Sequence, residues 1–98
     1  MENNLAYYET MYLVSPAINE NVTLQLIEKY QAFLTEKGCC PIVQNRGRRH
    51  LKYPIKKHDD ATYIQVNFYA NTDILAGLKR QFALDEDVLR HVTFRVQA

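Results

Sequence analysis

The segment YIQVNFYA, from Tyr63 to Ala70, is the clearest strand signal in the sequence and decides what kind of sheet the chain builds. Its side chains alternate between an apolar set and an amphipathic set, which is the two-residue period of a strand whose faces meet different surroundings. The apolar set is Ile64, Val66, Phe68 and Ala70, and the amphipathic set is Tyr63, Gln65, Asn67 and Tyr69. We expect the apolar face to lie in a core beneath helices and the other face to stay open.

Two amphipathic helices are predicted. The first begins after Asn19, whose side chain can accept hydrogen bonds from the free N–H groups of the first turn, and Gly38 supplies the left-handed turn that ends it. Its apolar residues recur at three- and four-residue spacings, at Val22, Leu26, Ile27, Tyr30, Phe33 and Leu34. The second helix follows the YIQVNFYA strand and is capped by Asn71. Its expected buried side consists of Ile74, Leu75, Leu78 and Phe82.

Two segments before the YIQVNFYA strand also have strand character. Tyr7–Val14 is predicted to form the first strand, because it is rich in β-forming residues. Cys40–Asn45 is predicted to begin the second strand, which continues through a basic stretch with an interruption at Gly47, since a glycine inside a strand often marks a bulge. Pro54 cannot donate to a ladder, so this end is expected to lie on a sheet edge or to have left the sheet.

The remaining segments are predicted to be two turns and a last strand. His58–Ala61 is expected to be a turn or short loop, and Asp85–Asp87 a turn that leads into the strand Val88–Val96. In this last strand we expect Val92, Phe94 and Val96 to face inward and His91, Thr93 and Arg95 to face outward.

The resulting order, β-α-β-β-α-β, predicts an α+β protein of the ferredoxin-like type, with a four-stranded antiparallel sheet and both helices on one face. Since there is no repeat and no linker, residues 1–98 are expected to form a single domain. The open face would be left for a partner. Its expected members are Tyr63, Gln65, Asn67, Tyr69, Thr93, Arg95 and part of the basic stretch.

The charge is distributed unevenly along the chain. The formal net charge is only +1, yet Arg46–Lys57 holds six of the twelve Lys and Arg residues and no carboxylate. From Lys37 to Lys57 there are seven bases and no acid, whereas the rest of the chain carries five bases and eleven acids, a net −6. Such segregation indicates one limited contact with a polyanion or an acidic partner rather than a general nucleic-acid coat.

The basic stretch admits two interpretations. Lysines and prolines on an edge strand protect a sheet against unwanted pairing, which would explain Lys52, Pro54 and Lys56. Arginines around a glycine fit that role less well, because arginine is favoured where a planar group contacts phosphate or carboxylate. We therefore expect an anionic ligand, with a nucleic-acid backbone as the leading candidate. Stacking of bases on Tyr63 and Tyr69 is less favoured, because the sequence signature of stacking sheets is absent around them.

The sequence contains no pattern that indicates catalysis or a cofactor. It lacks a Gly-rich phosphate loop and a Ser or Cys with a recognisable base, so we expect no enzyme and no small-molecule substrate. His58 beside Asp59 is expected to belong to a solvated turn rather than a metal site. The adjacent cysteines Cys39 and Cys40 are expected to be reduced. No run of 18 apolar residues occurs, so no membrane span is predicted.

Several motifs together resemble the family of bacterial-type small-subunit ribosomal protein six (S-six), over roughly Tyr7 to Val96. The motifs are Tyr8-Glu9, Gly47-Arg48-Arg49 leading into Leu51, Lys52-Tyr53-Pro54-Ile55-Lys56-Lys57, Tyr63 and Val88-Leu89-Arg90. The histidine within the central block and the pair Lys57-His58 resemble cyanobacterial or plastid members. The chain departs from the family where Ala6 and Tyr7 replace a basic residue and where Lys52 replaces a small one.

The resemblance implies a structural protein of the small ribosomal subunit, in a cytoplasmic ribosome or in the plastid stroma. It implies pairing with small-subunit ribosomal protein eighteen and joint binding of the central domain of small-subunit rRNA. The residues then expected to contact RNA or the partner are Tyr8, Arg46, Arg48, Arg49, Lys52, Tyr53, Lys56, Arg90 and Arg95. The alternatives are a stand-alone RNA-binding module and a small-ligand-binding regulatory domain on the same fold.

Overall fold

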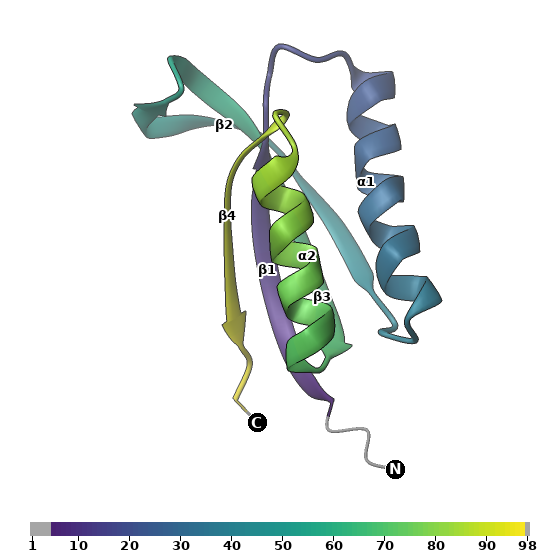
Figure 1. The fold of residues 1–98 in the computed structure, drawn as a ribbon. Coiled ribbons are helices and arrows are strands. Elements are labelled where there is room, and N and C mark those ends of the chain that lie inside the picture. Colours follow the sequence, from purple (N-terminus) through teal and green to yellow (C-terminus); the bar gives the residue numbers. More distant parts are fainter. Residues whose placement is uncertain (1–4, 98) are drawn as a thin grey trace.

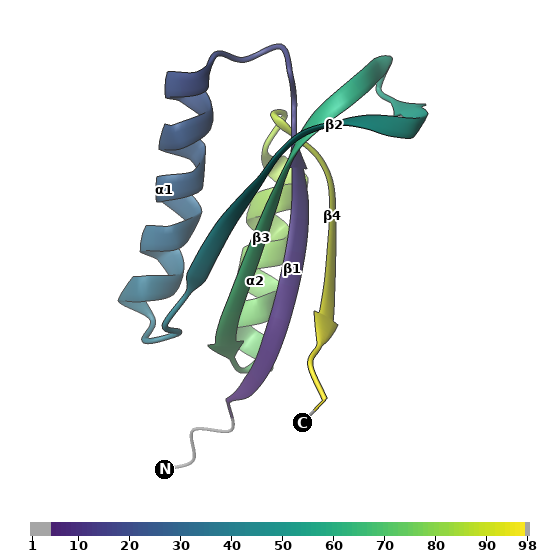
Figure 2. The ribbon, with the colours of Figure 1, turned by 180° about the vertical axis from the view of Figure 1, so that it is seen from behind.

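The computed structural model describes residues 5–97 and has the predicted order of elements (Figure 1). The elements are β1 (Ala6–Val14), α1 (Glu20–Glu36), β2 (Ile42–Ile55), β3 (His58–Ala70), α2 (Thr72–Leu84) and β4 (Val88–Arg95). The strands form one antiparallel sheet in the order β2-β3-β1-β4. Both helices cover the same face, and Figure 2 shows the sheet from the side that they leave open. The ferredoxin-like prediction is confirmed.

The helices begin where the sequence predicts. The Asn19 side chain accepts a hydrogen bond from the backbone N–H of Val22 at 2.9 Å, and Asn71 accepts one from Ile74 at the same distance. Each bond satisfies one of the donors that a first helical turn leaves free. Gly38, at φ +74°, lies in the left-handed turn after α1, as expected.

The main core lies between the helices and one face of the sheet. The apolar set of β3 is buried there, together with Leu26, Tyr30 and Leu34 from α1 and Leu75, Leu78 and Phe82 from α2. Three aromatic rings pack at its centre: Tyr12 of β1 lies 4.9 Å from Phe82 and 5.6 Å from Tyr30 between ring centroids. Such pairs add about 0.5–1.5 kcal/mol each beyond the burial of their area.

A second apolar cluster lies on the opposite face of the sheet. It consists of the buried residues Leu13, Leu51, Ala61 and Leu89, with Met11, Ile55 and Tyr63 packed against them. This cluster joins the middle of β2 to β1 and β4, although β2 is hydrogen-bonded only to β3. The open face is therefore partly filled by its own side chains.

The predicted faces of β4 are wrong. Val92 and Phe94 are each 50% exposed and lie on the open face, while Thr93 bonds to Thr10 at 2.7 Å on the helix face. The reason is a register shift between Leu13 and Val14 of β1, which pair with Arg90 and Val88. Leu89 is therefore an extra residue, and every later side chain of β4 lies on the opposite face from the one that unbroken alternation predicts. His91 consequently packs on the Phe82 ring at 5.1 Å, and burial, with a smaller contribution from Lys79, lowers the pKa of the imidazole.

The prediction that His58–Ala61 is a turn or loop is also wrong. These residues belong to β3, with His58 opposite Ile55 and Asp60 opposite His50. Lys56 and Lys57 alone form the hairpin turn. The segment resembled a loop in sequence because three of its four residues are polar or charged, and Ala61 alone of the four is buried, in the second apolar cluster.

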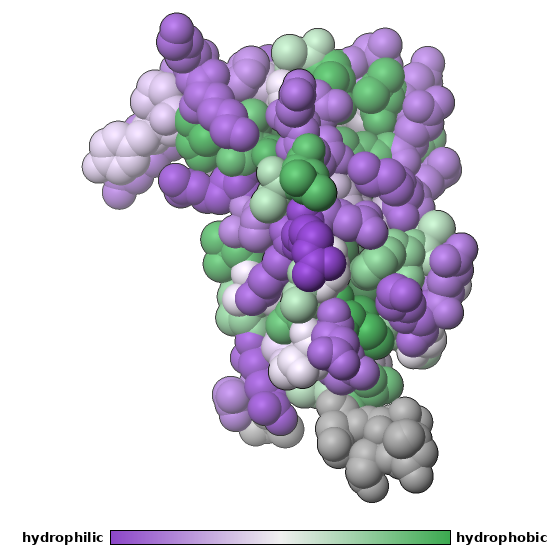
Figure 3. Space-filling model, in the orientation of Figure 1, coloured by the Kyte–Doolittle hydropathy of each residue, from purple (hydrophilic) through white to green (hydrophobic). Residues whose placement is uncertain are grey.

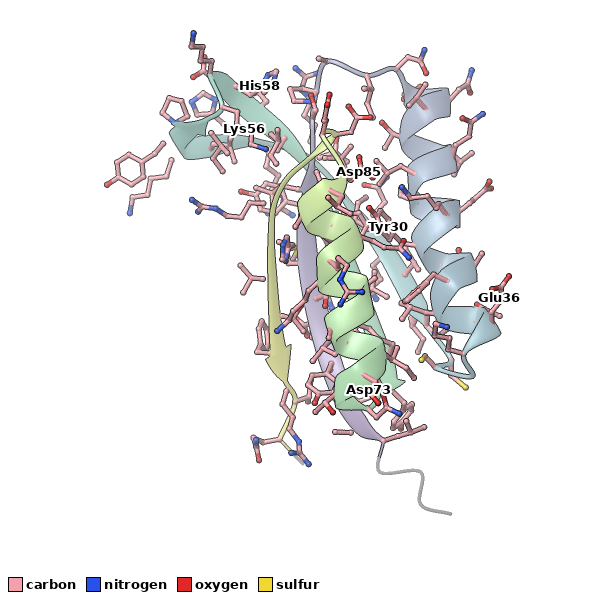
Figure 4. All side chains as sticks on the ribbon, in the orientation of Figure 1. Tyr30, Glu36, Lys56, His58, Asp73 and Asp85 are labelled. Carbon is pink, nitrogen blue, oxygen red and sulfur yellow. The ribbon has the colours of Figure 1, made fainter. Side chains whose placement is uncertain are left out.

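A carboxylate clamp ties α1 to the turn after α2. Asp85 Oδ2 accepts hydrogen bonds from Tyr30 Oη at 2.8 Å and from Lys29 Nζ at 3.0 Å, and Figure 4 shows Tyr30 and Asp85 pointing toward one another. Burial alone would raise the pKa of Asp85, but the hydrogen bonds from Lys29, Tyr30 and the Asp87 backbone outweigh it and lower the pKa. Burial and the neighbouring carboxylate raise the pKa of Tyr30, so its hydroxyl remains a donor.

Asp85→Ala is expected to lower the free energy of unfolding at pH 7 by about 2 kcal/mol, since it removes hydrogen bonds to a charged group that is mostly buried. Because folding depresses the pKa of Asp85, its contribution is complete above an unfolded value of about 4 and is lost as the pH falls through the folded value. Urea unfolding at several pH values measures this, with Glu28→Ala on the exposed side of α1 as the control. A difference between wild type and Asp85→Ala that persists unchanged to pH 2 would contradict the clamp.

Candidate RNA and protein interface

The β2–β3 hairpin projects beyond the helices as an arm (Figures 1 and 2). We use the name arm for residues 46–60. The molecule measures 46 × 26 × 22 Å along its principal axes, and the space-filling view shows hydrophilic side chains over much of this projection (Figure 3). Six of the nine residues predicted to contact RNA or a partner lie on it: Arg46, Arg48, Arg49, Lys52, Tyr53 and Lys56. The fold thus gathers most of the predicted site on one element.

The arm begins at the bulge that the sequence predicts at Gly47. The register shifts between Asn45 and Gly47, and the Gly47 N–H donates to Asn45 Oδ1 at 2.8 Å. Gly47 has a φ of +87°, in the left-handed region that favours glycine. The bulge inserts one extra residue, Arg46, into β2, and this residue has no partner in the ladder with β3.

Arg46 lies over the open face and ends a polar row that crosses the sheet. Its Nε and Nη2 atoms donate to Gln65 Oε1 at 3.0 and 2.8 Å. Gln65 Nε2 donates to Asn67 Oδ1 at 2.9 Å, and Asn67 Nδ2 donates to Glu9 Oε1 at 3.4 Å. The row holds the guanidinium against the sheet, so Arg46 is oriented toward whatever covers this face.

Arg48 and His50 lie on the other side of the arm and share one carboxylate. Arg48 Nη2 lies 3.2 Å from Asp60 Oδ2, and His50 Nδ1 lies 3.1 Å from Asp60 Oδ1. The hydrogen bond from His50, together with the Arg48 contacts, holds the pKa of Asp60 below its ordinary value against the opposing effect of desolvation. Sequence reasoning missed this contact because it placed Asp60 in a loop. A hairpin that pairs the long basic strand with residues 58–60 would have predicted it.

The rest of the predicted arm residues are less constrained. The Arg49 guanidinium lies 6.0 Å from the centroid of the Tyr63 ring, at the outer limit of a cation–π contact. Lys52 and Lys56 are exposed, and Tyr53 is 73% exposed. An aromatic ring with that much exposed area gains little from its own fold and is accessible to a partner.

Three predicted residues lie away from the arm. Tyr8 is half-buried on the helix face, where its ring centroid is 6.1 Å from that of Phe68. Arg95 is opposite Tyr8 and therefore shares the helix side of β4, contrary to the expectation that it faces outward onto the open face. Arg90 is opposite Leu13 and lies on the open face. Arg90 follows Leu89, which packs in the same apolar cluster as Leu51 of the arm, whereas Tyr8 and Arg95 lie on the helix side of the sheet.

An apolar area on the open face was missed. Val92 and Phe94 are exposed there on the free edge of the sheet, and Tyr69 is 46% exposed, with its ring centroid 4.7 Å from that of Tyr7. We call these four residues the β4 patch. Alternation along β4 did indicate an apolar side, but only the bulge at its start shows that this side faces away from the helices.

Other features of the described residues add no chemistry. No group of three His, Cys, Asp or Glu side chains within residues 5–97 could hold a metal ion, and Cys39 and Cys40 are free thiols. No helix in this part of the chain is long and apolar enough to cross a membrane. An open hollow of about 430 Å³ lies between α1 and the base of the arm, lined in part by Ile18, Leu24 and Arg48.

The fold and site define a ferredoxin-like α+β protein with a basic projecting arm and an open sheet face that carries an apolar patch. The family model of ribosomal protein S6 matches residues 7–95. Small ribosomal subunit protein bS6c of Guillardia theta is 45% identical over 87 residues, 88% of this chain and 91% of that relative. Small ribosomal subunit protein bS6 of Gloeobacter violaceus is 40% identical over 89 residues, 90% of this chain and 93% of that relative.

The chain belongs to the ribosomal protein S6 family, and the sequence-based identification is confirmed. The solved structure of 30S ribosomal protein S6 from Thermotoga maritima has a TM-score of 0.88 at 24% identity and covers 95% of this chain and 89% of that one, which shows the shared fold. The C-terminal domain of MgtC from Mycobacterium tuberculosis has a lower TM-score of 0.53 at 13% identity. A related arrangement of elements thus occurs in a protein of a different name, and fold alone does not define function.

Gly47→Ala is expected to lower the free energy of unfolding by about 1–2 kcal/mol, because an alanine at φ +87° is strained. A Cβ at this position meets nothing within 4 Å, so the effect is conformational rather than steric. Thermal and urea unfolding measure it. Gly77→Ala is the matched control: the new Cβ would lie 3.5 Å from Phe33, an ordinary contact, and alanine is the better residue inside α2. Equal stability of Gly47→Ala and wild type would exclude a strained bulge.

Proposed function

We propose that this small-subunit ribosomal protein binds the central domain of small-subunit rRNA together with small-subunit ribosomal protein eighteen. The observation that carries the proposal is the separation of two surfaces of different chemistry. One is the basic arm, and the other is the open sheet face with the β4 patch. Two such surfaces suit a protein that contacts an RNA and a protein at the same time.

The arm is proposed to contact rRNA phosphate. Its arginines and lysines concentrate positive charge on a protein whose remaining segments are net negative. Phosphate contacts fix the position of a protein on RNA without reading its sequence, so the role is structural. Asp60 neutralises part of the charge near Arg48 and His50, while Arg49, Lys52 and Lys56 form no ion pair within residues 5–97.

The open face is proposed to pack against ribosomal protein eighteen. Exposed Val92 and Phe94 would be buried by a protein partner, which gains about 25 cal/mol for each Å² of apolar area removed from water. Beside them the row from Glu9 to Arg46 offers hydrogen-bonding groups of both signs. Apolar area beside hydrogen-bonding groups is the ordinary composition of a protein interface.

The relatives of this chain are bacterial and plastid small-subunit proteins, so its ribosome would lie in a bacterial cytoplasm or a plastid stroma. Co-sedimentation with small ribosomal subunits from a cell lysate tests the function. The protein should sediment with them at low salt and be released at high salt, since phosphate contacts release counterions. Tight binding to short free RNA without any partner would favour a stand-alone RNA-binding module instead.

Arg48→Ala combined with Arg49→Ala is expected to leave the fold intact and to weaken incorporation into small subunits about tenfold or more, because two cations at the base of the arm are removed. Reconstitution with small-subunit rRNA and ribosomal protein eighteen measures incorporation, and circular dichroism checks the fold. Lys79→Gln with Arg80→Gln, which removes two charges from exposed positions of α2, is the control. Undiminished incorporation of the Arg48 and Arg49 variant would remove these residues from the site.

Val92→Thr combined with Phe94→Thr is expected to weaken binding of ribosomal protein eighteen about tenfold or more, because the apolar area of the β4 patch is lost while strand propensity is kept. Titration calorimetry with the purified partner measures the affinity. Leu84→Thr is the control, since Leu84 is 77% exposed at the end of α2, outside the sheet. Wild-type affinity of the doubly substituted protein would show that the partner lies elsewhere.

A further inference from the structure

The turn at the end of the arm combines an unfavourable backbone conformation with two positive charges. Lys56 has a φ of +51° and Lys57 a φ of +70°, and the pair connects Ile55 of β2 to His58 of β3. Two central residues with positive φ are the pattern of a type I′ hairpin turn, which strongly favours Asn-Gly. Lysine at both positions is strained, because its Cβ approaches the backbone in this conformation.

Folding by itself gives no reason for these lysines. Neither side chain forms an ion pair or a hydrogen bond to any group within residues 5–97, and both are exposed. Figure 4 shows Lys56 and His58 on the projecting hairpin, away from the helices and the core. A residue pair that costs conformational energy and whose side chains form no ion pair or hydrogen bond within the fold is a sign of function rather than of stability.

The surroundings of the turn suit an anionic surface. Lys52 is exposed on the same segment, and Pro54 removes a backbone donor from this edge of the sheet. Tyr53 offers a largely exposed ring on which an unpaired base could stack. Arg48 and His50 contact the carboxylate of Asp60 near the base of the arm. Asp59, which is exposed, is the other acidic residue close to the turn in sequence.

We infer that the Lys56–Lys57 turn is itself an RNA-phosphate contact, for which the chain keeps two lysines in a conformation that favours Asn-Gly. The inference rests on the proposed function and sharpens it. It adds Lys57 to the contact residues and extends the RNA contact to the end of the hairpin, beyond the sheet face. Long cationic side chains on a narrow hairpin can reach phosphates where a broad sheet face cannot approach.

The test replaces the turn by the residues that its geometry prefers, Lys56→Asn with Lys57→Gly. Strain and charge are removed together, so stability and binding should change in opposite directions. The melting temperature is expected to rise by about 5 °C. Affinity for a transcript of the central domain of small-subunit rRNA, in the presence of purified ribosomal protein eighteen, should fall about tenfold near 0.15 M salt. The slope of log affinity against log salt should decrease by about two.

Two controls accompany this variant. Lys56→Arg with Lys57→Arg keeps both charges in the strained turn and should bind with nearly wild-type affinity. Lys79→Gln with Arg80→Gln on α2 makes the same change in net charge at a distance from the arm and should also retain affinity and salt slope. Both proteins are measured with the same transcript and partner as the turn variant.

The inference is overturned if the Asn-Gly variant binds the transcript with unchanged affinity and slope, if the α2 control loses as much, or if the Asn-Gly variant melts at a lower temperature than wild type. It is also overturned if binding of ribosomal protein eighteen alone is reduced while the RNA affinity is kept, since an acidic protein surface would then be the ligand. Failure of the wild-type protein to bind the transcript with its partner would instead contradict the proposed function. The two failures are therefore distinguishable.

Discussion

The central pairing of β1 with β3 is the constraint on which the rest of the structure depends. The two strands run antiparallel from Ala6 opposite Ala70 to Val14 opposite Thr62, without a break in register. One face of this pair is buried under both helices, which fixes the register because a slip of one residue would turn the apolar set toward water. β2 and β4 each attach to one side of the pair and inherit their orientation from it. The open face exists because both crossovers place their helices on the same side.

The arm depends on a different kind of support. Beyond the bulge at Gly47 it is out of reach of the main core, and a two-stranded hairpin alone is only marginally stable in water. Leu51 and Ile55 therefore pack with Leu13 and Leu89 on the open side of the sheet. Asp60 adds contacts to Arg48 and His50. These interactions allow a charged, exposed hairpin to persist as a defined structure and to present its side chains in a fixed arrangement.

Much of the site was predictable because charge and turn chemistry are local properties. Within Arg46–Lys57, the lysines and Pro54 predicted an edge strand, and Gly47 predicted its bulge. The motif resemblance then predicted which of these residues contact RNA or a partner. The Asp60 contacts, the polar row at Arg46 and the β4 patch were not predictable in the same way. Each depends on which residues of two separate strands lie opposite one another, and a single bulge changes that for every later position.

By itself, the sequence determined the order of the elements, the caps of both helices at Asn19 and Asn71, the inward face of β3 and the family. These follow from spacing, capping and motifs, which act over a few residues. Only the tertiary structure decided the direction of the β4 side chains, the extent of β3 to His58 and the strained turn at Lys56–Lys57. The apolar side of an edge strand can lie on either face of a sheet, and a strand end that is mostly charged resembles a loop. Those choices depend on register, which is fixed only when the strands pair.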